Sequence, residues 1–125
     1  MSGISDADVL GALRRQMTIA AARQAAAAGN LANIDTPNYK AVDVSFSDTL
    51  HAQLSTTSPK HLTPPGTPGV QTEEVQDAAA RRDGNTVVLD QELLKMGRAA
   101  SDFSAAQTAL AAKFRLVRYA INEGR

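Results

Sequence analysis

Two long stretches of apolar residues at alternating spacings of three and four, one near each end of the chain, constrain the fold most. This spacing is the heptad pattern of helices that pack side by side. The first stretch contains Leu10, Leu13, Met17, Ala20, Gln24, Ala27, Leu31 and Ile34. The second contains Leu89, Leu93, Met96, Ala100, Phe103, Gln107, Leu110, Phe114, Val117 and Ile121. The pattern predicts one helix from about residue 6 to residue 33 and another from residue 89 almost to the C-terminus, with these residues forming a helical seam.

Residues that favour helix ends flank both stretches. Ser5 and Asp8 have the spacing of an N-terminal capping pair, and Asp90 is an expected N-cap for the second helix. Asn33 suits the end of the first helix because asparagine tolerates the left-handed conformation. Asn122 and Gly124 suit the end of the second.

The predicted helices are too long for a small globule. At a rise of about 1.5 Å per residue, 27 to 32 residues span roughly 40 to 48 Å. The two helices can pair as a hairpin, but 23 of the apolar residues are alanine, so the core is thin. We expect one partner helix to leave a second edge uncovered, formed by Ala99, Ala106, Ala109, Leu94 and Leu116. A bundle with other chains is therefore expected.

The middle of the chain reads as an insert between the helices. Alternating Val42, Val44 and Phe46 predict a strand over residues 41–46. Four prolines in residues 55–69 predict a mobile surface loop. A turn at residues 83–85 precedes residues 86–89, a candidate short strand that could pair with the first. The predicted fold is mainly α, one structural unit made of a core at 1–40, an insert at 41–88 and a core at 89–125.

Composition and charge exclude several classes of function. The chain has 13 basic and 13 acidic residues, so it lacks the basic excess of a nucleic-acid binder. It has no cysteine, which excludes disulfides and thiolate metal sites. The most apolar run, residues 19–28, is too short to insert into a membrane, and the acidic N-terminus does not resemble a cleaved signal peptide.

No set of residues suggests catalysis. His51 and His61 are expected to be solvated loop histidines, and Ser47 and Asp48 near them lack a residue that would orient a base. A metal site would need more ligands than these. We therefore expect no catalytic residue, no cofactor and no metal.

The densest local signal is the turn that follows the first predicted helix. Asp35 and Thr36 can bond to nearby amides, and Pro37 fits position i+1 of a β-turn. Asn38 then falls at position i+2, which predicts a positive φ and a type II turn or a close relative. This turn would present Tyr39 and Lys40 sideways.

This segment resembles the N-terminal motif of the bacterial flagellar axial proteins. Asn38 stands where that family has glycine, a tolerable change because asparagine also accepts positive φ. The continuation through residues 39–46 and the turn and following residues at 83–87 look most like the proximal-rod subunits. The residues that match the family motif in place are Asn30, Leu31, Ala32, Asn33, Thr36, Tyr39 and Lys40.

The resemblance implies a non-enzymatic structural subunit of the flagellar basal-body rod, which transmits torque. Such subunits leave the cytoplasm through the flagellar type III export apparatus without a cleaved signal peptide. They assemble helically in the periplasm with copies of themselves and other rod subunits, above the inner-membrane ring and the rod adaptor protein, and their terminal helices form the tubular core. Another rod-type axial subunit and a soluble coiled-coil adaptor remain the alternatives.

Overall fold

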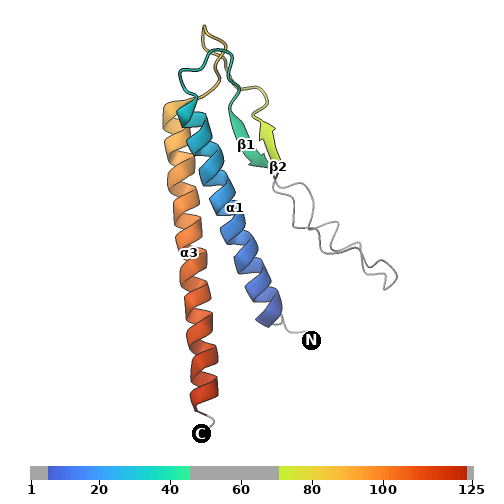
Figure 1. Ribbon diagram of the computed structural model, residues 1–125, viewed down its shortest axis with the longest axis vertical. Helices are drawn as coiled ribbons and strands as arrows, with labels where there is room; N and C mark the ends of the chain where they lie inside the picture. The colour runs from blue at the N-terminus through green and yellow to red at the C-terminus, as the bar shows by residue number, and fades with distance from the viewer. Residues whose placement is uncertain (1–5, 46–70, 124–125) are drawn as a thin grey trace, which may run out of the picture.

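The computed structural model describes residues 6–45 and 71–123 (Figure 1). In chain order its elements are α1 (Asp6–Ala32), β1 (Val42–Ser45), β2 (Gln71–Glu74) and α3 (Leu89–Asn122). The predicted mainly α fold, with two long helices and a short β insert, is confirmed. The predicted loop at residues 55–69 and the two histidines lie outside the described residues, as do Ser5 and Gly124.

The two helices lie side by side and run in opposite directions (Figure 1). Asp6 and Asp8 stand in the first turn of α1, where their charge complements the helix dipole. Lys113 of α3 forms an ion pair with Asp6 at 2.6 Å, so this level of α3 faces the start of α1. Because α3 has 34 residues and α1 has 27, α3 continues past that level. We call residues 114–122 of α3 the overhang.

Buried alanines lie on both helices of the α1–α3 pair. Ala20, Ala27, Ala99 and Ala106 are at most 4 % exposed. The expectation that Ala99 and Ala106 lie on an uncovered edge was therefore wrong. Small side chains allow the two backbones to approach closely, so the contact forms where alanines recur every seven residues on both helices.

Two further sequence predictions about the helices need correction. Val88, which makes no side-chain capping bond, occupies the N-cap position of α3, and Asp90 lies inside the first turn. There the Asp90 charge still complements the helix dipole. Gln24, predicted in the seam, is exposed.

The insert contributes a two-stranded antiparallel ribbon. Its register pairs Val42 with Glu74 and Ser45 with Gln71. The predicted first strand is confirmed for Val42–Ser45, but its partner is β2 and not residues 86–89, which form no strand. The residues just before β1 do contact the residues just before α3: the Thr86 backbone N–H donates to the Tyr39 carbonyl at 3.1 Å.

Candidate functional site: the turn cluster and the α3 overhang

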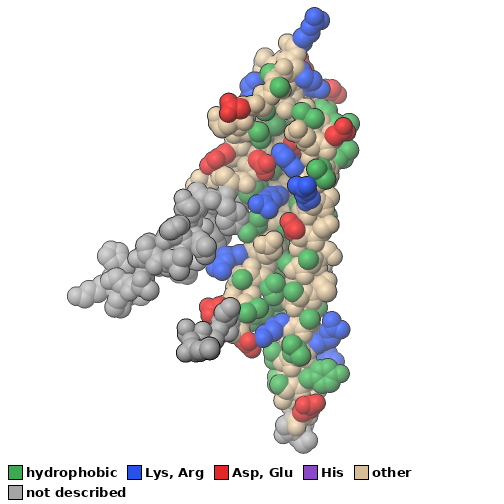
Figure 2. Space-filling view, turned by 180° about the vertical axis from the view of Figure 1, so that it is seen from behind, with side chains coloured by type: hydrophobic (Ala, Val, Ile, Leu, Met, Phe, Trp, Pro, Cys, Tyr) green, Lys and Arg blue, Asp and Glu red, His purple; other side chains and the backbone are tan. Residues whose placement is uncertain are grey.

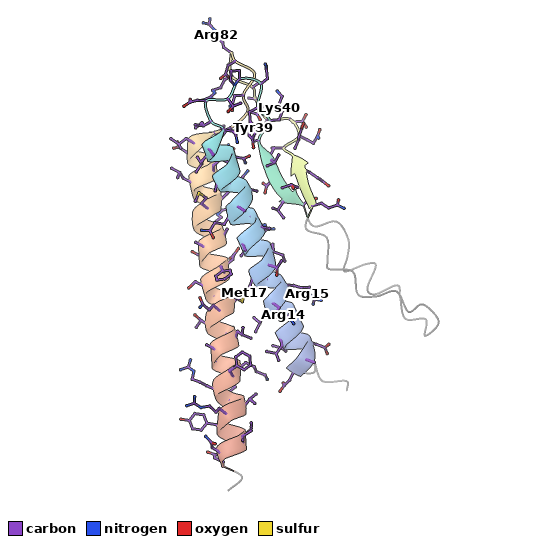
Figure 3. All side chains as sticks on the ribbon, viewed as in Figure 1. Arg14, Arg15, Met17, Tyr39, Lys40 and Arg82 are labelled. Carbon is purple, nitrogen blue, oxygen red and sulfur yellow. The ribbon has the colours of Figure 1, made fainter. Side chains whose placement is uncertain are left out.

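Two segments far apart in the sequence interlock at the end of the helix pair. They are residues 30–41, which leave α1, and residues 81–87, which lead into α3; together we call them the turn cluster. Figure 3 shows Tyr39 and Lys40 where the chain leaves the helix pair, and Arg82 pointing away from the tip. Most of the predicted motif residues belong to this cluster.

The turn at residues 36–39 has the predicted geometry. Asn38 has a φ of 59°. The Tyr39 N–H donates to the Thr36 carbonyl at 3.3 Å, which places Pro37 at position i+1 and Asn38 at position i+2. The positive φ at i+2 is characteristic of a type II turn. The Asn38 N–H also donates to the Asp83 carbonyl at 2.8 Å, so the turn is tied to the second segment.

Among the described residues other than glycine, positive φ occurs at Asn38 and Asp77, so the left-handed conformation expected at Asn33 is not formed. Asn33 nevertheless follows the last residue of α1, as predicted. Its backbone N–H and its side-chain Nδ2 both donate to the Gly29 carbonyl, at 3.2 and 2.9 Å. The Thr36 hydroxyl donates to Asn33 Oδ1 at 3.1 Å and so bonds to a side chain, not to an amide N–H. These bonds satisfy groups that the end of a helix would otherwise leave without partners.

Four motif residues form no side-chain hydrogen bond with the described residues. Leu31 is half-buried, and Ala32, Asp35 and Pro37 are exposed. Their contribution is local backbone conformation or packing.

Asn85 connects the two segments from inside the cluster. Its side chain is fully buried, and its Nδ2 donates to the carbonyls of Asn33, Ile34 and Thr36 at 2.9, 3.1 and 2.8 Å. Its Oδ1 accepts the Val87 N–H at 2.8 Å. One amide therefore satisfies the carbonyls of the first turn and orients the chain just before α3.

Gly84 packs directly against Asn38. Its φ is 79°, and a Cβ placed on it would lie 2.3 Å from Asn38 Oδ1. Its carbonyl accepts a hydrogen bond from the Lys40 ammonium at 2.9 Å. Position 84 therefore requires glycine for both its backbone conformation and its contact with Asn38.

Asn30 binds the ribbon to the helix pair. Its Nδ2 donates to the Val42 carbonyl at 2.7 Å, and its Oδ1 accepts the Val42 N–H at 3.0 Å, as a neighbouring strand would. Nδ2 also donates to Glu92 Oε2 at 2.9 Å, and the Tyr39 hydroxyl donates to Oδ1 at 3.3 Å. Asn30 is fully buried and Glu92 is 2 % exposed, so one satisfied polar network connects α1, β1 and α3.

Lys95 extends this network to the surface. Its ammonium lies 3.2 Å from Glu92 Oε1 and 3.2 Å from Asp43 Oδ2. Burial opposes the charged form of Lys95, but hydrogen bonds and Coulombic attraction from Asp43 and Glu92 outweigh it and raise the pKa of Lys95 above its ordinary value.

A cavity of about 340 Å³ lies between the ribbon and the two helices. Its walls carry both signs of charge, with Lys95, Arg23 and Arg98 opposite Asp43 and Asp102. Charged side chains, and not a packed apolar core, therefore line much of the space beneath the ribbon.

The predicted helical seam is divided between contact and surface. Leu10, Leu13, Met17, Met96, Phe103 and Leu110 are half-buried. Leu93 is 52 % exposed, and the large apolar residues of the overhang are 43 to 69 % exposed. The overhang residues are Phe114, Leu116, Val117, Tyr119 and Ile121. In Figure 2, which views the molecule from behind, apolar side chains lie beside Lys and Arg side chains at this lower end.

Within residues 6–45 and 71–123, no group of three or more potential His, Cys, Asp or Glu ligands could hold a metal ion. Over the same residues, neither helix combines the length and hydropathy that crossing a membrane would require.

Sequence reasoning missed two residues of the site. Asn85 was placed in a turn, but its three carbonyl contacts depend on residues about 50 positions earlier in the chain. Glu92 gave no signal, because an acidic residue in a first helical turn is ordinarily solvated. Its burial is explained by its contacts with Asn30, 62 positions away, and with Lys95.

Comparison with known proteins points to one family. Residues 12–40, from the second turn of α1 to the end of the turn motif, match the family model described as flagella basal body rod protein. No curated protein matches the chain. The matched segment includes the asparagines that end α1, bind the ribbon and form the turn, and in this segment the chain is similar to the flagellar basal-body rod family.

Proposed function

We propose that this chain is a structural subunit of the bacterial flagellar basal-body rod and performs no catalysis. The observation that carries the proposal is the family match at residues 12–40. The matched segment contacts residues 81–87, which lie outside the match, through the buried Asn85. The segment that matches the family is therefore also the segment that connects α1 to the residues that lead into α3.

Within the rod, we assign the chain to the proximal part, as a protein of the FlgB type. Two sequence features support this finer assignment, namely the continuation of the motif through residues 39–46 and the Asp83-Gly84-Asn85 turn before α3. Hydrogen bonds hold these two regions together, for example the bond from the Lys40 ammonium to the Gly84 carbonyl.

The overhang is the surface through which we expect the subunit to contact its neighbours. Five large apolar side chains are exposed there on one stretch of helix. Burying each against another subunit would contribute roughly 1.5–3 kcal/mol. Arg115 and Arg118 border this surface and favour a partner with acidic groups at its edge.

The partners in this proposal are copies of the chain and other rod subunits, with the inner-membrane ring and the rod adaptor protein at the base. The chain would reach them through the flagellar type III export apparatus without a cleaved signal peptide. The rod lies in the periplasm, and its helical assembly would allow the subunits to transmit torque.

The test is genetic and biochemical. Deleting the coding sequence in its source bacterium should abolish swimming and leave basal bodies without a rod, and expressing the chain again should restore both. Mass spectrometry of basal bodies purified from the complemented cells should detect the chain. Normal rods in the deletion strain, or absence of the chain from purified basal bodies, would contradict the proposal.

A soluble coiled-coil adaptor is the second candidate, because an exposed apolar helix face could also pair in solution. An adaptor should sediment as a stable dimer or trimer at micromolar concentration. A rod subunit should sediment as a monomer and associate only with rod components.

A further inference from the structure

The β1–β2 ribbon is attached to the helix pair by polar contacts at its inner strand. Every residue of β2 is exposed, so β2 contributes nothing to the helix contact. β1 places Val44 and the preceding Ala41 in buried positions, but the cavity of about 340 Å³ with charged walls lies directly beneath it. Apolar packing therefore holds the ribbon only in part.

Two specific contacts complete the attachment. The first is the pair of hydrogen bonds between Asn30 and the Val42 backbone, at 2.7 and 3.0 Å, which is buried or half-buried. The second is the ion pair between Lys95 and Asp43 at 3.2 Å, in which the side chains are 33 % and 48 % exposed. An ion pair of that exposure is weak and is screened by salt.

The ends of the ribbon are held differently. At the turn cluster, the Ala41 N–H donates to the Thr86 hydroxyl at 2.8 Å, and the Ala41 carbonyl accepts the Val75 N–H at 2.9 Å. These bonds anchor the base of the ribbon. The Lys95–Asp43 ion pair lies farther along β1, among the residues Val42, Asp43 and Val44 that line the cavity.

We propose that the linked side chains of Asp43, Lys95 and Glu92 form a latch. The ribbon is then an arm, hinged at the turn cluster, and this arm opens while α1 and α3 stay together. The buried Glu92 holds the Lys95 ammonium at the helix surface, and Asp43 is the part of the latch that leaves when the arm opens. Buried alanines of both helices form part of the contact between α1 and α3, and this part does not involve the Lys95–Asp43 ion pair. This inference concerns the isolated chain and stands independently of the proposed role in the rod.

The latch provides a subunit with an adjustable insert. If the chain packs among neighbours that differ along a rod, an arm released by loss of the Lys95–Asp43 ion pair and of the two Asn30–Val42 hydrogen bonds can change direction while the helical core keeps its geometry. An acidic side chain of a neighbour could also compete with Asp43 for Lys95, since the cavity opens beside it.

Amide hydrogen exchange of the whole chain, followed by NMR, tests the latch. The reporter is the Val42 N–H, whose acceptor is the Asn30 side chain, so this proton exchanges when β1 leaves the helices. In Lys95→Met, which keeps the length of the side chain and removes the ammonium, exchange at Val42 should accelerate about 1.4-fold to 5-fold, the range expected for an exposed ion pair. Amides at Ala20 and Ala106, which are buried and do not line the cavity beneath the ribbon, should keep their rates.

Two comparisons make the test specific. Arg98→Met removes a cation that lines the same cavity but forms no ion pair with residues 6–45 or 71–123, and it should leave the Val42 rate unchanged. Raising the salt concentration to about 1 M, where the screening length falls to about 3 Å, should accelerate exchange at Val42 in the wild type and not further in Lys95→Met.

An unchanged Val42 rate in Lys95→Met would overturn the proposal. So would an equal acceleration at Ala20 and Ala106, or a general loss of structure, because either result would show that ribbon and helix pair open as one body. An equal effect of Arg98→Met would show that general cavity charge, and not the latch, holds the arm.

Discussion

Four asparagines perform four different tasks at the scale of single residues. Asn33 satisfies the end of α1, Asn38 adopts the positive φ of the turn, Asn30 imitates a strand toward Val42, and Asn85 donates to three carbonyls. An amide suits all four because it carries both donors and an acceptor on a short side chain. The charge-bearing aspartate, which has nearly the same shape, could perform few of these tasks.

Asn38 should tolerate substitution according to the cost of its positive φ of 59°. Glycine should be as stable as asparagine or slightly more stable, alanine should lose about 1 kcal/mol and valine about 2 kcal/mol, because Cβ crowds the left-handed conformation. Urea unfolding followed by circular dichroism measures the order. Asp35→Ala, at an exposed neighbouring position, is the control and should change stability little. A valine variant as stable as the wild type would contradict this assignment of strain.

Gly84 and Asn38 should be energetically coupled, because a Cβ at position 84 would lie 2.3 Å from Asn38 Oδ1. Gly84→Ala should therefore destabilise the wild type more than it destabilises an Asn38→Gly background, by about 0.5–1 kcal/mol. The positive φ of 79° remains a cost in both backgrounds. A double-mutant cycle in urea measures the difference, and additive losses would show that the contact carries no energy.

Asn85→Asp keeps the shape of the side chain and replaces its donor with a second acceptor. A carboxylate would then face the carbonyls of Asn33, Ile34 and Thr36 without a proton to share. We expect a loss of about 3 kcal/mol at pH 7, since a buried group loses its bonds and gains unpaired charge. The loss relative to the wild type should shrink at pH 4, where protonation restores one donor. A loss that is equal at both pH values would argue against this account of Asn85.

At the scale of elements, the sequence predicted what depends on residue type and spacing. The helix spans followed from the heptads, and the turn followed from Pro37 and Asn38. On α1 the predicted seam residues Ala20 and Ala27 are buried. On α3 the helix contact was misplaced, because heptad spacing of large residues favours Leu93 and Phe114 over Ala99, although a close contact selects the smaller side chain.

The missed elements depend on contacts between distant residues. β2 has the sequence Gln-Thr-Glu-Glu, which lacks the apolar alternation of a strand and forms one only by pairing with β1. Glu92 is buried only because Asn30 and Lys95 surround it. Neither feature is visible in a local window of the sequence.

The latch between ribbon and α3 should respond to alkaline pH. Because the pKa of Lys95 is raised above 10.5, the stabilisation by its ammonium is complete below pH 10.5 and is lost as the pH rises through the higher folded value. The titration midpoint of the Lys95 side chain, measured by NMR of its ε-carbon, should lie above 10.5 in the wild type. In Asp43→Asn it should fall, because burial then opposes the charge with one carboxylate fewer. The same midpoint in both proteins would show that Asp43 does not act on Lys95.

At the scale of the whole molecule, the chain has more apolar surface than its own fold covers. α3 has 34 residues and α1 has 27, and the part of α3 beyond the Lys113–Asp6 pair exposes its largest side chains (Figure 1). A single subunit offers no described element to cover the overhang. The turn cluster, at the opposite end of the helix pair, is instead internally satisfied. Val88, Leu89, Leu93 and Leu94, beside the turn cluster, are also 44 to 54 % exposed, so the described residues leave apolar surface uncovered near both ends of α3; the overhang is the open end that lies beyond α1.

Removal of the overhang tests the central claim, that this open end assembles the subunit into the rod. A chain that stops after Lys113 keeps the described turn cluster and the helix contact, so its folded core should persist, as judged by helical circular dichroism of the purified protein. Expressed in the deletion strain at wild-type level, it should give no rods in electron micrographs of isolated basal bodies, whereas the full chain gives them. Rods in normal number from the truncated chain would contradict the account.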